Sequence, residues 1–145
     1  MVQMVRFLAL PLVLLGAPIL AQPAADWTSA VSSPSLALAR HPREARAWQS
    51  VVPPSYRRTR WIYRLEGNSS QPRIVQSGGR SYVLGTVCKP HDCYANVGAF
   101  LIALDGRRAA GGLLFNRAGR SREIYFGNPS PYERALLRSI LMLGQ

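Results

Sequence analysis

Apolar residues along the chain change from a helical to an alternating spacing near Tyr56. Between residues 28 and 52 they recur every three or four residues, and a break at His41-Pro42 predicts two short helices on either side of it. Beyond Tyr56, short runs rich in Val, Ile, Tyr and Phe are separated by Gly, Asn and Arg, which is typical of strands and turns. The chain therefore changes from helices to a sheet at this point.

Five of these runs are predicted strands, and most of the links between them are tight turns. They are about Arg73 to Gln76, Ser81 to Val87, Val97 to Leu104, Ala110 to Asn116 and Ser121 to Phe126. Links as short as Ser77-Gly78-Gly79 and Asp105-Gly106 join neighbouring strands that run in opposite directions, so the sheet is expected to be an antiparallel meander.

The chain is predicted to end in a helix. Ser130 can cap its first turn, Pro131 suits the first helical position, and Glu133 can reach back to the serine N–H. Apolar residues between 135 and 143 then form a wide stripe that needs a sheet to cover. Helices, a meander sheet and a closing helix together indicate an α+β domain.

The N-terminal segment has the pattern of a signal peptide. Arg6 precedes the apolar run from Phe7 to Gly16, and small residues follow. We expect residues 1–21 to be removed by cleavage near Ala21, leaving residues 22–145 as a single domain exported to the periplasm. The apolar run has about half of the roughly 20 residues that a spanning helix needs, so no stable membrane anchor is expected.

The formal net charge of +11 raises the possibility of a nucleic-acid partner, but the pattern does not favour one. The arginines are spread from Arg40 to Arg138 without a dense block, and no recognised nucleic-acid motif is present. An exported protein also rarely meets nucleic acid as its cognate partner. A cationic module that binds the cell envelope is the alternative that this charge leaves open.

The segment Cys88-Lys89-Pro90-His91-Asp92-Cys93, called the cysteine loop below, concentrates rigid and titratable residues between two apolar strands. The two cysteines of an exported chain most simply form a disulfide. A bridge across so short a loop stabilises the fold by only about 2 kcal/mol, so its main effect is to stiffen the loop. Pro90 restricts the loop further, and the loop can then present Lys89, His91 and Asp92 to a partner at a low entropic cost.

Other chemistries fit the cysteine loop less well. A metal site needs three or four ligands, and the only other histidine, His41, lies in a different element, so neither a metal nor a cofactor is expected. Thiol–disulfide catalysts carry C-x-x-C, which is not the spacing here. No Ser/His/Asp set, phosphate loop or close carboxylate pair is visible, so we expect no enzyme activity. A purely structural hairpin loop, in which His91 bonds Asp92, stays open as an alternative.

The cysteine loop resembles the signature of the inhibitor of vertebrate lysozyme (Ivy) family. The resemblance extends over roughly residues 35 to 143. It includes Trp61-Ile62-Tyr63-Arg64, Tyr82-Val83, Ala99-Phe100-Leu101-Ile102-Ala103, Gly112-Leu113-Leu114-Phe115 and a leucine-rich C-terminal helix. It implies a three-layer α/β/α sandwich whose five-stranded meander sheet wraps around the C-terminal helix.

The resemblance also implies a function for the cysteine loop. The loop would enter the cleft of a C-type lysozyme, where His91 hydrogen-bonds the two catalytic carboxyl groups, and so protect peptidoglycan against host defence. Lytic transglycosylases of the same cell are a second possible target, because they also hold a catalytic acid in a peptidoglycan cleft. Animal lysozymes are themselves cationic, so long-range attraction to this basic chain is not expected.

Overall fold

The computed structural model describes residues 21–29 and 33–144. The predicted signal peptide therefore lies outside the described residues, except for Ala21. Within the described part of the chain, no helix combines the length and the apolar character needed to cross a membrane.

The N-terminal part of the domain consists of short helices. They are α1 (Ala21–Thr28), α2 (Pro34–Arg40), α3 (Pro42–Val51), the 3-10 helix η1 (Pro54–Tyr56) and α4 (Arg60–Tyr63). The predicted break is confirmed, because His41 ends α2 and precedes α3, and Pro42 is the first residue of α3. The Ser33 hydroxyl caps α2 by accepting a hydrogen bond from the Leu36 N–H at 3.3 Å. The sequence did not predict α1, η1 or α4.

The sheet is antiparallel throughout. Its strands are β1 (Asn68–Ser69), β2 (Arg73–Ser77), β3 (Arg80–Cys88), β4 (Asn96–Ala103), β5 (Ala109–Arg117) and β6 (Arg120–Phe126). The order is β1-β3-β4-β5-β6, and β2 pairs with β3 beside β1. The five predicted strands correspond to β2–β6 and are confirmed. The sequence missed β1, whose two exposed residues show no apolar alternation.

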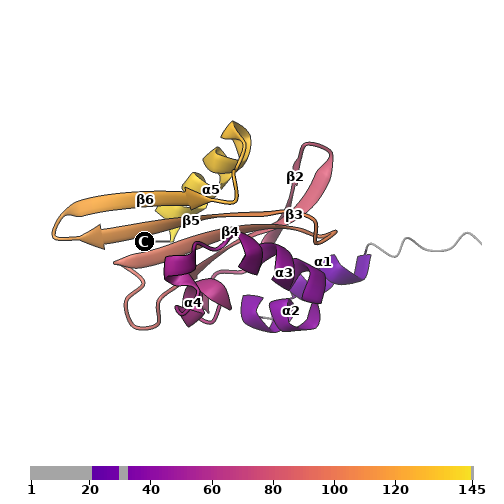
Figure 1. Ribbon diagram of the computed structural model, residues 1–145, viewed down its shortest axis with the longest axis horizontal. Helices are drawn as coiled ribbons and strands as arrows, with labels where there is room; N and C mark the ends of the chain where they lie inside the picture. The colour runs from indigo at the N-terminus through magenta and orange to yellow at the C-terminus, as the bar shows by residue number, and fades with distance from the viewer. Residues whose placement is uncertain (1–20, 30–32, 145) are drawn as a thin grey trace, which may run out of the picture.

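Two buried cores lie on the two faces of the sheet. Phe100 of β4 packs with Trp27 and Trp48 of the N-terminal helices, whereas its neighbour Leu101 packs with Leu137 of α5 (Pro131–Leu143). This alternation along β4 explains why all of its residues are buried. Figure 1 shows the N-terminal helices on one side of the sheet and α5 on the other. The predicted three-layer arrangement is therefore confirmed.

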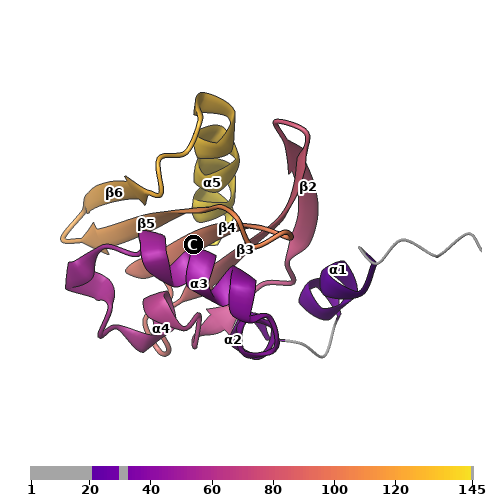
Figure 2. The same cartoon turned by 45° about the vertical axis from the view of Figure 1, so that its right-hand side comes forward.

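Helix α5 begins as the sequence predicts, with both hydrogen bonds of a capping box between Ser130 and Glu133. Figure 2 shows α5 between β6 and the β2–β3 hairpin. The Ser77 hydroxyl of β2 donates to Glu133, and Arg138 of α5 pairs with Glu123 of β6 at 3.3 Å. The sheet thus curves around the helix, as the family resemblance implied.

Candidate functional site

The cysteine loop connects β3 to β4. A disulfide joins Cys88, the last residue of β3, to Cys93, with 4.8 Å between their Cα atoms, and this confirms the predicted bridge. Cys88 is buried and Cys93 is half-buried, and both pack against the core beneath α5. The base of the loop is therefore anchored in the α5-side core.

Backbone hydrogen bonds make the loop a closed turn. The Lys89 N–H donates to the Asn96 carbonyl at 3.1 Å, and the Asp92 N–H donates to the Lys89 carbonyl at 3.0 Å. The Asn96 N–H then donates to the Asp92 carbonyl at 3.1 Å. These bonds and the disulfide fix the path of the chain on both sides of the tip. The loop therefore loses little conformational entropy when it binds a partner.

The carboxylate of Asp92 is turned towards β4. It accepts a hydrogen bond from the side-chain amide of Asn96 at 2.6 Å, and the Lys89 ammonium lies 3.7 Å away. Among the described residues, the structure has no hydrogen bond between Asp92 and His91, and the carboxylate is bonded to Asn96. Asn96 is buried, and the sequence did not single it out because an asparagine at the start of a strand carries no specific signal.

His91 lies at the tip of the loop and is exposed, as are Lys89 and Pro90. Its backbone has a φ of 65°, in the left-handed region that histidine adopts more readily than most residues with a side chain. Within residues 21–29 and 33–144, no hydrogen bond or ion pair of the His91 side chain is found. Both ring nitrogens therefore remain available to a partner.

The segment after the loop is fixed to the neighbouring hairpin. The Asn116 side-chain amide donates to the Tyr94 carbonyl at 3.0 Å, and the Asn116 N–H donates to the Ala95 carbonyl at 2.9 Å. The Tyr94 side chain itself is 74% exposed beside the loop. Tyr94 and Asn116 are further residues of the site that the sequence did not single out.

The second histidine of the chain belongs to a different environment. His41 Nε2 lies 3.0 Å from an Asp26 carboxylate oxygen, and its ring stacks on Trp27 with 6.4 Å between centroids. It therefore connects α1 to the junction of α2 and α3. Across the described ranges, no group of three or more His, Cys, Asp and Glu side chains is placed to hold a metal ion.

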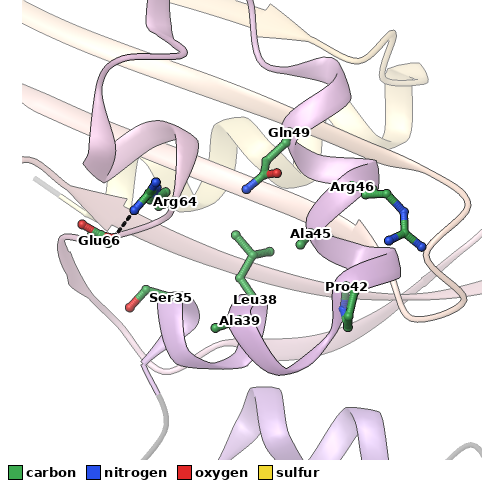
Figure 3. A pocket seen from close by; sticks show the side chains of 9 residues that line it. All are labelled: Ser35, Leu38, Ala39, Pro42, Ala45, Arg46, Gln49, Arg64 and Glu66. Atoms are coloured by element: carbon green, nitrogen blue, oxygen red, sulfur yellow. Dashed lines mark ion pairs between the residues drawn. The ribbon is translucent and has the colours of Figure 1, made fainter.

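A groove of about 500 Å³ lies between α2, α3 and the segment after α4 (Figure 3). Leu38, Gln49 and Arg64 are among its lining residues, and Arg64 faces Glu66 at 3.8 Å. The groove contains no nucleophile with an adjacent base, so it does not suggest a reaction. The cysteine loop remains the site with the most distinctive chemistry.

Comparison with known proteins identifies the family. The family model described as "Inhibitor of vertebrate lysozyme (Ivy)" matches residues 43–124, which run from α3 into β6 and include the whole cysteine loop. No curated protein gives a significant sequence match to the chain. The chain belongs to the Ivy family, and this membership supports a role as a lysozyme inhibitor.

Proposed function

We propose that the protein acts in the periplasm as an inhibitor of C-type lysozyme and inserts the cysteine loop into the active-site cleft with His91 leading. Family membership supports the inhibitory role. The observation that carries the insertion mechanism is the position of His91, exposed at the tip of a closed loop with both ring nitrogens available. The signal-peptide pattern of the sequence supports export.

The chemistry of the imidazole suits a lysozyme cleft. Such a cleft holds one protonated and one ionised carboxyl group close together. A neutral imidazole has one N–H donor and one bare nitrogen acceptor, so it can donate to the carboxylate and accept from the acid at the same time. No proton has to move for both carboxyl groups to be satisfied.

The rest of the loop supports this arrangement. Because the Asp92 carboxylate is bonded to Asn96, it does not compete with the target's carboxyl groups for His91. Lys89 and Asp92 also carry opposite charges 3.7 Å apart, which reduces the net charge that the loop brings into the cleft. The loop therefore offers its imidazole in a nearly neutral, rigid frame.

We also propose that the protein inhibits without catalysing a reaction of its own. Six of its seven acidic residues lie within ion-pair distance of a basic side chain, and Glu66 contacts Arg64 in addition to Arg60. These pairs are His41–Asp26, Arg60–Glu66, Arg80–Asp105, Lys89–Asp92, Arg108–Glu133 and Arg138–Glu123. Carboxylates distributed in this way serve structure, whereas glycosidases hold two together.

A titration of peptidoglycan-cleaving enzymes tests the proposal. The purified protein is added to a C-type lysozyme and, in parallel, to a lytic transglycosylase, and the rate of cell-wall hydrolysis is followed. The proposal expects lysozyme activity to fall in proportion to added inhibitor. If the protein inhibits the transglycosylase but not the lysozyme, its target is an enzyme of its own cell. Binding only to anionic vesicles would favour an envelope-binding module.

A further inference from the structure

Three arginines gather on one face of the β5–β6 hairpin. Arg117 pairs with Arg120, and Arg122 pairs with Phe115, in an unbroken antiparallel register. Directly opposed residues project from the same face, and so do alternate residues along each strand. All three arginines therefore share the face on which Phe115 packs towards the N-terminal helices. The interpretation of the arginines as scattered is wrong at this hairpin.

These arginines border a groove with an aromatic floor. Tyr56, Phe115, Arg117, Arg120, Ser121 and Arg122 line a volume of about 460 Å³, called the arginine groove below. The rings of Tyr56 and Phe115 stack with 6.0 Å between centroids and 27° between planes, and both are half-buried. The groove is thus concave, apolar below and cationic at its rim.

The cationic rim is not neutralised by the protein. Like charges placed directly opposite one another on a sheet destabilise it, and Arg117 and Arg120 are such a pair. Among the residues that the structure describes, neither these two nor Arg122 has an ion pair or a side-chain hydrogen bond. Guanidinium groups bind carboxylates through two parallel hydrogen bonds, so acidic side chains are suitable partners.

The arginine groove lies at the same end of the sheet as the cysteine loop. Asn96, the first residue of β4, pairs with Phe115 of β5. Strand β5 continues beyond this pair, so the turn of the β5–β6 hairpin extends past the start of β4 (Figure 1). Asn116 binds the hairpin to the carbonyls of Tyr94 and Ala95, just after the loop. A target enzyme large enough to cover His91 together with this end of the sheet would therefore also meet the arginines.

We propose that the arginine groove binds acidic side chains at the rim of the target enzyme's cleft, and that the protein therefore prefers targets with an acidic rim. This inference rests on the proposed function, because the target is the enzyme held by the cysteine loop. A lipid surface fits the groove less well. A membrane is flat, and a protein that binds it inserts exposed apolar side chains into the lipid. The exposed large apolar residues of the described chain lie on α2, β2, α5 and at Tyr94.

The test compares one C-type lysozyme with its own variant in which basic residues at the cleft rim are replaced by glutamate. The inhibitor variant is Arg117→Gln/Arg120→Gln/Arg122→Gln. Its matched control is Arg43→Gln/Arg46→Gln/Arg107→Gln, which removes the same charge from exposed arginines near the β4–β5 turn, at the other end of the sheet. The association rate of each protein is measured at low and high salt.

The wild type and the control are expected to associate with the acidic-rim lysozyme about tenfold faster than the groove variant at low salt. High salt should remove this advantage, because it screens the charges. Equal rates for the groove variant and the wild type at low salt would overturn the inference. An equal loss in the control variant would also overturn it, since the effect would then come from total charge.

Two further measurements separate this inference from the proposed function. If the wild type inhibits neither lysozyme, the proposed function fails, and the groove is then judged by titration with a penta-glutamate peptide, followed by NMR of arginine side chains. If the wild type and the control variant bind the peptide but the groove variant does not, the acidic preference is supported. If the wild type does not bind the peptide, the acidic preference is overturned. Anionic vesicle binding that the groove variant loses, with lysozyme association unchanged, also overturns it in favour of a membrane surface.

Discussion

The side-chain amide of Asn96 donates a hydrogen bond of 2.6 Å to the carboxylate of Asp92, and so joins the first residue of β4 to the cysteine loop. Asn96 is only 5% exposed, and a buried amide without a partner is costly. Its backbone also exchanges hydrogen bonds with Lys89 and Asp92. The shape of the loop thus depends on a residue outside the loop itself.

Replacing Asn96 should weaken inhibition. Asn96→Ala removes a hydrogen bond to a charged group, worth about 1.5–3 kcal/mol, and frees the Asp92 carboxylate to compete for His91. We expect the inhibition constant for C-type lysozyme to rise about tenfold. Asn68→Ala is the control, because its amide makes only a 3.6 Å contact with Cys93 Sγ. Unchanged inhibition by Asn96→Ala would show that the hydrogen bond from Asn96 to Asp92 is not needed for inhibition.

Reduction of the disulfide should affect inhibition more than stability. The bridge closes a loop between residues five apart in sequence, for which the chain-entropy model gives only about 2 kcal/mol. Cys88→Ser/Cys93→Ser should therefore remain folded but lose the rigid presentation of His91. Thermal melts and inhibition titrations of the two proteins check this. A large fall in melting temperature with full inhibition would contradict it.

The sequence predicted those parts of the fold that have a local signal. The helix break at His41 and the capping box of Ser130 and Glu133 need only neighbouring residues, and both are present. The arginine groove has no local signal, because Arg117 and Arg122 come together only through the β5–β6 register.

The same distinction applies to the candidate site. The loop and its disulfide could be predicted because their residues are consecutive and their chemistry is unusual. The bond between Asn96 and Asp92 could not, because their rotamers depend on how the loop closes against β4. Strand β1 was missed since two exposed residues give no periodicity.

Glu133 should make stability depend on pH. Burial raises the pKa of its carboxyl, but hydrogen bonds from Arg108 at 2.6 Å and the Ser130 N–H at 2.8 Å outweigh burial and lower the pKa below its ordinary value. Its stabilisation is therefore full above the ordinary carboxyl pKa and is lost as the pH falls through the lower folded-state value.

Glu133→Gln is accordingly expected to destabilise the protein by about 1–3 kcal/mol near neutral pH, with a smaller difference in acid. Urea denaturation at about pH 7 and about pH 3 measures this. Inhibition by the folded fraction should not change, because Glu133 lies at the start of α5, beside Arg108 and far from the loop. If the difference in unfolding free energy between wild type and Glu133→Gln is the same at both pH values, the assigned ion pair between Arg108 and Glu133 is contradicted.

Salt should not slow the binding of a cationic lysozyme. The chain carries a formal net charge of +11, so long-range repulsion precedes contact and is screened as ionic strength rises. The association rate measured by stopped flow should rise or stay level between low and high salt. A steep fall would indicate that acidic groups of this lysozyme already face the arginine groove.

His91 is the residue on which the proposed mechanism depends. If its imidazole bonds both carboxyl groups in the cleft, its removal leaves those groups unpaired, and inhibition should weaken by about 2–5 kcal/mol. The fold should change by no more than about 0.5–1 kcal/mol, because the side chain is exposed at the loop tip. His91→Asn is a second variant, since asparagine also tolerates the observed φ of 65°.

The most direct measurement is therefore the inhibition constant of His91→Ala and His91→Asn against C-type lysozyme, with thermal melts of the same samples. His41→Ala is the control, because His41 contacts Asp26 and Trp27 rather than the cysteine loop. We expect both His91 variants to be folded and to inhibit at least about 30-fold less well, and folded His41→Ala to inhibit normally. Near wild-type inhibition by folded His91→Ala would contradict the loop-insertion mechanism.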